Sequence, residues 1–257
     1  MANDSHVLIS EDNRVMTIAW NRPDKKNALT QEMYSQVADA LLRAGDDAAV
    51  RVVVLTGTED CFTAGNDLAD FLKNPSTDAD SPVVRFLTNL SQFNKPIVAA
   101  VNGAAVGVGT TMLMHCDMVV AADTTKFSLP FAKLGVCPEG ASSYLLPMLA
   151  GYQRAAELLM LGDSFDAHEA REFGLVNRIA TASDYQAVAA ELAARLAAMP
   201  PNSIRTTKAL LKRNQQAGIA AAFEVEFKQF SAMLSGPEAK EAMSAFMERR
   251  AADFSKF

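Results

Sequence analysis

The chain has 257 residues, of which 49% are hydrophobic, and it carries a formal net charge of −6 at pH 7. This length and apolar fraction predict one large domain, or one domain with an appendage, built on a sizeable core. The acidic balance argues against a nucleic-acid partner, so an acidic ligand would have to meet local basic residues. Three cysteines without a CxxC pair favour reduced thiols and a cytoplasmic location.

A membrane partner is also unexpected. Residues 96–116 contain no Asp, Glu, Lys or Arg and are about long enough to span a bilayer. Asn102, two threonines and three glycines interrupt this segment, so burial inside a folded core explains its lack of charge better. The first residues lack a basic region followed by an apolar core, and we therefore expect no signal peptide.

In chain order, residues 6–10 and 15–20 are typical of a strand pair. A basic loop, residues 21–29, is expected to follow, and Thr30 is placed to cap a helix with a stripe of apolar residues at helical spacing. Residues 51–56 form a continuous apolar run that predicts a buried strand. After it we expect a loop and a further helix, at residues 61–68 and 83–93 respectively.

The central segment, residues 95–144, has the most informative pattern. Its β-branched apolar run at 96–101 predicts a buried strand, and a glycine-rich turn then leads into a segment at 110–116 that can start a helix. A second strand is predicted at 118–122, and Glu139 follows in a loop. Free N–H groups at a glycine-rich helix start can hold an anion, and a lone carboxylate nearby can move a proton. A donor pair and one base are the minimum for chemistry next to a carbonyl.

Beyond residue 144 the pattern becomes helical. Asp166 and Glu169 have the spacing of a capping box, and a short strand is expected at 175–179. Further helical segments follow, including an alanine-rich one at 184–198. Strands that alternate with helices, followed by a run of helices, predict an α/β fold class. We expect a core over residues 1–200 and a helical C-terminal part over residues 201–257.

Two short motifs suggest other functions, namely dinucleotide binding and nucleophilic catalysis. Gly107 and Gly109 supply two-thirds of a dinucleotide-binding fingerprint, with Asp123 after the next strand, but the third glycine is missing. His115 and Cys116 suggest a nucleophile pair, yet neighbours on a helix point about 100° apart. No His, Cys and acidic group has the spacing of metal ligands, so no metal is expected.

Six motifs together resemble the crotonase superfamily, the enoyl-CoA hydratases and isomerases. They lie at residues 21–29, 62–68, 95–109, 116–122, 127–140 and 246–250. The resemblance covers nearly the whole chain. It implies a spiral of strand–strand–helix turns with a helical C-terminal trimerisation part, assembled as a homotrimer or a dimer of trimers.

The resemblance also implies a site for an acyl-CoA thioester, with CoA as part of the substrate and no separate cofactor. The backbone N–H groups of Asn66 and Val108 match the positions that hold the thioester oxygen. Basic residues, one of them from a neighbouring subunit, would meet the CoA phosphates, and a short loop would line the path of the CoA arm. The matching residues are Lys25, Lys26, Ala28, Ala64, Gly65, Asp67, Leu68, Phe246 and Arg249.

Within the superfamily the acids decide the reaction. Thr111 and Phe131 stand where the hydratases carry their two glutamates, and neither can act as a carboxylate base. Glu139, in CPEGASSY, matches the sole catalytic glutamate of the peroxisomal-type Δ3,Δ2-enoyl-CoA isomerases. The sequence therefore predicts isomerisation of 3-enoyl-CoA to trans-2-enoyl-CoA. A hydratase or other acyl-CoA lyase of the same fold, and a non-catalytic acyl-CoA-binding protein, remain alternatives.

Overall fold

The computed structural model describes residues 5–58, 60–73, 80–248 and 250–257. Its larger sheet has six strands in the order β1-β2-β3-β5-β7-β10. The β1–β2 pair is antiparallel and all other neighbours are parallel. The strands are β1 Val7–Asp12, β2 Val15–Trp20, β3 Val52–Gly57, β5 Ile97–Val101, β7 Met118–Ala122 and β10 Arg178–Ala180.

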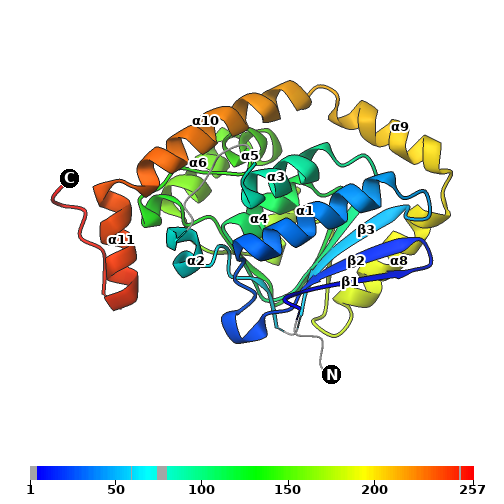
Figure 1. The fold of residues 1–257 in the computed structure, drawn as a ribbon, viewed down its shortest axis with the longest axis horizontal. Helices are drawn as coiled ribbons and strands as arrows, with labels where there is room; N and C mark the ends of the chain where they lie inside the picture. The colour runs from blue at the N-terminus through cyan, green and yellow to red at the C-terminus, as the bar shows by residue number, and fades with distance from the viewer. Residues whose placement is uncertain (1–4, 59, 74–79, 249) are drawn as a thin grey trace.

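Helices cover both faces of this sheet, which is why β3 and β5 are buried along their whole length. Alternate residues of β3 enter different cores: Val53 and Leu55 pack on one face, and Val52 and Val54 on the other. The first core includes α1 (Gln31–Asp46) and α3 (Pro82–Gln92), which lie side by side (Figure 1). The second core is closed by α8 (Tyr185–Ala198).

A second sheet was not predicted. It has four short strands in the order β4-β6-β8-β9, namely β4 Cys61–Thr63, β6 Ala104–Val106, β8 Lys126–Ser128 and β9 Phe165–Asp166. The expectation of loops at residues 61–63 and 104–106 is therefore wrong. Strands of three residues show no usable alternation, and their hydrogen-bond partners come from distant parts of the chain.

The two sheets together give the predicted succession of elements. Each of β3, β5 and β7 is followed by a short strand of the second sheet, and β4 and β6 lead on to helices. This confirms the α/β class and the strand–strand–helix turns. The remaining short elements are η1 Pro23–Lys25, α2 Leu68–Lys73, α4 Val108–Thr111, η2 Met112–His115, η3 Ala132–Leu134, α5 Ser142–Ala150, α6 Tyr152–Leu161 and α7 Ala167–Glu172.

Several local predictions can be compared with these bounds. Thr30 caps α1 by accepting from the Met33 N–H, and the Asp166/Glu169 capping box opens α7, both as predicted. The strand expected at residues 175–179 instead spans Arg178–Ala180. The N–H groups of residues 175 and 176 both donate to the carbonyl of Ala170, so the chain is still closing α7 at those positions.

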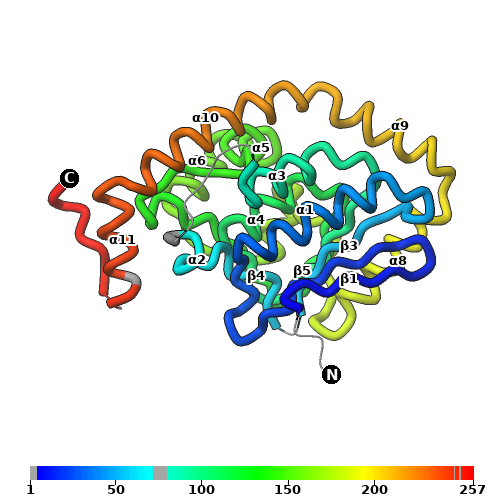
Figure 2. Tube along the Cα trace, in the orientation of Figure 1, coloured from blue at the N-terminus to red at the C-terminus, as the bar shows by residue number. Residues whose placement is uncertain are grey.

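The C-terminal helices are α9 Pro201–Lys212, α10 Gln216–Leu234 and α11 Pro237–Glu248. α9 and α10 arch over the domain, α10 packs on α5, and α11 lies at the left edge of Figure 2, away from the β1–β2 hairpin. Of the apolar residues on these helices, Leu234 and Met243 are buried inside the chain, whereas Met247 is exposed. The boundary at residue 200 stays a prediction.

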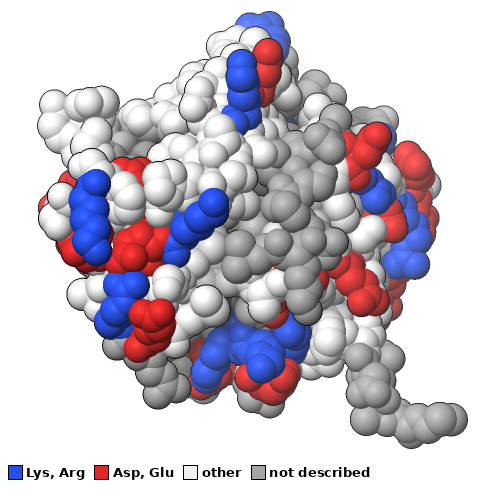
Figure 3. All heavy atoms as spheres, turned by 60° about the vertical axis from the view of Figure 1, so that its left-hand side comes forward, with Lys and Arg blue, Asp and Glu red and all other residues white. Residues whose placement is uncertain are grey.

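The surface around α11 has mixed charge. Figure 3 brings this side forward and shows Lys and Arg interspersed with Asp and Glu in small groups, with uncharged areas between them. Such a distribution offers a polyanion little continuous positive surface on the described part of this face. None of the helices in the described ranges combines the length and the apolar character needed to cross a bilayer.

Candidate active site

A cavity of about 610 Å³ opens between the loop that follows β4, the start of α4 and the C-terminal helices. The segments around η1, β4 and α4 contribute Lys25, Ala28, Ala64, Gly65, Asn66, Asp67, Leu68, Val106, Gly107 and Val108 to its wall. The remaining wall residues are all apolar: Phe71, Pro130, Phe131, Leu134, Val136, Phe230, Leu234 and Met243. The wall thus combines a few polar residues with a large apolar surface that can contact an apolar chain.

Two backbone donors face this cavity without an acceptor. Within the described ranges, no group accepts a hydrogen bond from the N–H of Asn66 or of Val108. Val108 is the first residue of α4, where a helix leaves its N–H groups unpaired. Asn66 is held by a bridge to Leu29, whose N–H donates to the Gly65 carbonyl at 2.8 Å. The two predicted donors therefore line one cavity and are both available to an oxygen.

Gly65 lets this loop approach β6 closely. Its φ is +91°, and a Cβ added there would lie 2.9 Å from the carbonyl oxygen of Val106. Any other residue would strain the backbone and push the loop away from the sheet. The neighbouring N–H of Asn66 is thus fixed by a contact that only glycine permits.

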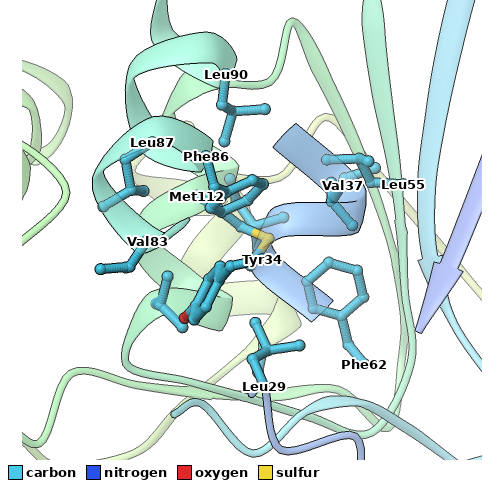
Figure 4. Close-up of a cluster of buried hydrophobic side chains, with 14 of the residues drawn as sticks. Leu29, Tyr34, Val37, Leu55, Phe62, Val83, Phe86, Leu87, Leu90 and Met112 are labelled. Carbon is cyan, nitrogen blue, oxygen red and sulfur yellow. The ribbon is translucent and has the colours of Figure 1, made fainter. Parts of the chain in front are cut away.

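The side chain of Asn66 has a buried partner that the sequence did not suggest. The hydroxyl of Tyr34 donates to Asn66 Oδ1 at 2.5 Å. The Tyr34 ring packs beside Phe86 of α3, with ring centroids 5.4 Å apart, in the apolar cluster drawn in Figure 4. In the sequence, the only sign of this partner was the hydroxyl of Tyr34 next to the apolar stripe of α1. That sign is weak because tyrosine is common in protein cores.

Glu139 is buried, with 6% of its surface exposed, and Thr111 Oγ1 donates to its Oε1 at 2.7 Å. Burial raises the pKa of Glu139 to about 8; the Thr111 hydrogen bond opposes this shift, and the nearby carboxyl of Glu226 adds to it. Glu139 is not among the cavity-lining residues of the described chain. Its carboxyl is instead joined to α4, the helix that begins with Val108.

The loop after Glu139 is tightly held. Gly140 has φ +70°, and a Cβ there would lie 2.7 Å from Thr111 Oγ1, so glycine is needed for this approach. His115 Nε2 donates to the Gly140 carbonyl at 2.8 Å, and the Ser142 hydroxyl donates to the Glu139 carbonyl at 2.6 Å. The result is a buried base with a fixed backbone.

Six of the predicted CoA-contacting residues, Lys25, Ala28, Ala64, Gly65, Asp67 and Leu68, lie on the cavity wall, whereas Lys26 does not. The Lys26 ammonium pairs with Asp60 at 3.3 Å on the exposed side of its loop. Arg249 lies outside the described residues, as does the side chain of Phe246. Asp67 lines the wall but is paired with Arg22 at 2.7 Å. Burial acts to raise the pKa of Asp67, yet the hydrogen bonds it accepts, led by that from Arg22, bring it below the usual value.

The alternative chemistries find little support in the geometry. The helix after Gly107 is only four residues long, which is short for a dinucleotide-binding turn. His115 and Cys116 do not pair: His115 binds the Gly140 carbonyl, and the Cys116 thiol donates to the Met112 carbonyl at 3.6 Å. No group of three or more His, Cys, Asp or Glu side chains suited to a metal occurs in the described part of the chain.

Sequence comparison decides the family. A family model described as Enoyl-CoA hydratase/isomerase matches residues 10–256. The chain belongs to the enoyl-CoA hydratase/isomerase family. It is thus an enzyme of a family in which a thioester site of the kind described above is expected.

Relatives in this family carry different activities in their names. The chain is 35% identical over 250 residues to rat enoyl-CoA delta isomerase 2, covering 95% of this chain and 64% of that protein. It is 30% identical over 251 residues to the 2,3-dehydroadipyl-CoA hydratase of Escherichia coli, covering 97% and 98% of the two chains. The structure of Pseudomonas aeruginosa OdaA superposes with a TM-score of 0.93 at 43% identity, covering 96% of this chain and all of that one.

Proposed function

We propose that the enzyme isomerises 3-enoyl-CoA to trans-2-enoyl-CoA, with Glu139 as its single acid–base residue. The observation that carries this proposal is that the buried carboxyl of Glu139, with its raised pKa, is hydrogen-bonded to α4, the helix whose first residue, Val108, supplies one of the two unpaired backbone donors in the cavity. The donors suit a thioester oxygen, and the apolar residues of the wall suit an acyl chain. The 35% identity to rat enoyl-CoA delta isomerase 2 supports the same reaction.

The reaction is a proton transfer in two steps. The Glu139 carboxylate removes a proton from C2, next to the thioester carbonyl. The C–H electron pair forms a dienolate whose negative charge falls on the thioester oxygen, between the N–H groups of Asn66 and Val108. Preorganised donors at that position are worth about 3–4 kcal/mol each. Protonated Glu139 then returns the proton to C4, the double bond moves to C2–C3, and the carboxylate is restored.

A single base is enough because C2 and C4 belong to one allylic unit. No water has to be activated, and no redox or metal step is needed to balance the reaction. A hydratase would instead need groups that hold and activate water. At the two positions where hydratase glutamates are expected, Thr111 donates to Glu139 and Phe131 lines the apolar wall.

Hydration remains the second candidate because several similar proteins, among them that of Escherichia coli, are named as hydratases. The two reactions differ in what happens to the conjugated thioester absorbance. A 3-enoyl-CoA given to an isomerase produces this absorbance, whereas a 2-enoyl-CoA given to a hydratase loses it. Supplying the two substrates separately tests the proposal. Loss of absorbance from the second, without its appearance from the first, would replace isomerase with hydratase.

We propose further that the enzyme is a homotrimer or a dimer of trimers and works in the cytoplasm. The support for assembly is the resemblance together with exposed apolar residues such as Met247 on α11. Light scattering at micromolar concentration tests it, and a monomer would contradict it. The support for the compartment is that Cys61, Cys116 and Cys137 are all free thiols.

A further inference from the structure

A second buried carboxyl holds the segment that follows Glu139. Glu226 lies in the middle of α10 and is 5% exposed. Its Oε2 accepts from the Ala141 N–H at 2.6 Å, and its Oε1 accepts from both the N–H and the hydroxyl of Ser143, at 2.9 and 2.5 Å. Burying a carboxyl is costly unless its oxygens are hydrogen-bonded, and here both oxygens are.

These contacts do the work of a helix cap at the start of α5. The residue before this helix is Ala141, which has no side-chain oxygen and sits in the left-handed region with φ +56°. A non-glycine residue there is strained and persists only where its surroundings hold it. Glu226 supplies the acceptors that the first N–H groups of α5 need, and a negative charge at a helix N-terminus is favourable.

The position of Glu139 depends on this cap. Only Gly140 separates Glu139 from Ala141, and the Ser142 N–H and hydroxyl both donate to the Glu139 carbonyl. The backbone of the base is thus continuous with the segment that Glu226 holds. On its other side the loop is held by Thr111 and His115. Loss of the Glu226 bonds would leave the Ala141 conformation unsupported and let the Glu139 carboxyl move.

The two carboxyls are also coupled by charge. Burial raises the pKa of Glu226, while its three hydrogen-bond donors oppose that shift. Among the described residues, the carboxyl of Glu139 accepts one hydrogen bond, from Thr111, and the charge of Glu226 acts to raise the pKa of Glu139 further. The carboxyl with more donors takes the negative charge first, so Glu139 keeps its proton to higher pH.

We propose that Glu226 is a positioning residue that fixes the start of α5 and places a second carboxylate beside Glu139, without touching the substrate. Residues 226, 230 and 234 are four apart on α10, so the face that carries Glu226 also brings Phe230 and Leu234 to the cavity wall. The helix α10 thereby contributes both apolar residues of the cavity wall and the carboxyl that holds the segment after Glu139.

Other titratable groups near the pair should not obscure the test. Tyr34 of α1, His115 of η2 and Cys137 of the preceding loop lie near Glu139 and Glu226. Lys212 of α9 is linked to this group because its ammonium donates to the His115 carbonyl. Burial lowers the pKa of His115 to about 4, raises that of Cys137 to about 11, and raises that of Tyr34 well above its usual value. Between about pH 5 and 9 Glu139 is therefore the group to follow.

The first experiment uses Glu226→Gln and needs no turnover. Carbon NMR of protein labelled at the glutamate carboxyl carbons follows the titration of Glu139, whose signal is identified by its absence in Glu139→Gln. We expect the Glu139 midpoint to fall by about one pH unit in Glu226→Gln, because a neighbouring negative charge is removed. Glu224→Gln, on the exposed side of the same helix, should leave the midpoint unchanged.

The second experiment measures kinetics and rests on the proposed function. In Glu226→Gln we expect kcat on 3-enoyl-CoA to fall by about 10- to 100-fold, with KM within about threefold of the parent, because the base is displaced but the CoA wall is not. Glu226→Asp keeps the charge and should recover the midpoint in part. If the parent itself proves inactive on 3-enoyl-CoA, the proposed function fails, and the NMR titration still decides the role of Glu226.

An unchanged Glu139 midpoint and an unchanged kcat in folded Glu226→Gln would overturn the inference. Should that variant not fold, Ser143→Ala removes one of the three donors to Glu226 and makes its charged form less stable. The Glu139 midpoint should then fall in the same direction by a smaller amount. A midpoint equal to that of the parent in Ser143→Ala would overturn the inference equally.

Discussion

The Thr111 hydroxyl donates to the Glu139 carboxyl at 2.7 Å, and both side chains are buried. Thr111, at a position where a hydratase would be expected to carry a glutamate, is thus a hydrogen-bond partner of Glu139. Because this bond favours the charged form, it lowers the pKa of Glu139 against the larger effect of burial. Thr111 therefore helps to make the base available near neutral pH.

Replacing Thr111 by Val should move the activity profile to higher pH. Val keeps the volume and removes the donor, so the apparent pKa for kcat/KM should rise from near 8 by about one pH unit. Activity at pH 7 should then fall by up to about tenfold, and the difference should shrink above pH 9. Thr111→Ser keeps the hydroxyl and is the matched control. A profile in Thr111→Val that overlies that of the parent would show that the bond has no influence on the base.

The free energy of unfolding should decrease with rising pH because of Glu139. Its pKa is higher in the folded chain than in the unfolded one, so the unfolded state loses its proton first and stability falls as pH rises from about 5 to 8. This fall should be smaller in Glu139→Gln by about 3 kcal/mol over that range. Urea unfolding of both proteins at several pH values measures it. Parallel curves for parent and variant would contradict a raised pKa.

Val108→Pro removes one of the two proposed oxyanion donors at a position that suits proline. Val108 is the first residue of α4, where proline is tolerated because the N–H has no helical partner. We expect turnover to fall by about 10²–10³-fold in folded protein. Val108→Ala keeps the N–H and should remain close to the parent. Normal turnover of the proline variant would remove Val108 from the oxyanion site.

Tyr34→Phe tests whether the bond to Asn66 orients the other donor. The ring still fills the cluster shown in Figure 4, but Asn66 Oδ1 loses its donor. We expect kcat to fall by about three- to tenfold, consistent with loss of one buried hydrogen bond. Tyr185 is buried in the second core, on the other face of the larger sheet, so Tyr185→Phe is the control for losing a tyrosine hydroxyl. Equal effects of the two changes would argue against a specific role for Tyr34.

The sequence predicted the long parallel strands because their apolar runs are continuous, as in β3 and β5. It could not predict β4, β6 and β8, because three-residue strands are defined by partners far along the chain. Residues 64–68 and Val108 were identified through a resemblance, and the cavity brings them together. Phe230 was missed, since an apolar residue on an amphipathic helix has the same pattern whether it lines a cavity or a core.

Glu226 illustrates a further limit. It is one of two acids on α10 and lies 85 residues from Ala141, and nothing in the local pattern separates it from the exposed Glu224 two residues before it. Only the packing of α10 on α5 shows that one of these carboxyls caps a helix and the other faces solvent. Side chains that act through a distant backbone leave no short-range signal.

The central claim is that Glu139 alone carries the proton, and Glu139→Gln tests it most directly. Gln keeps the size and removes the basic lone pair, so the folded variant should bind acyl-CoA as the parent does. Isomerisation of 3-enoyl-CoA should fall toward the upper end of about 10²–10⁴-fold, because the same group performs both transfers. Deuterium exchange at C2 should fall in parallel with turnover. A folded Glu139→Gln variant that isomerises 3-enoyl-CoA at a near-normal rate would contradict the mechanism.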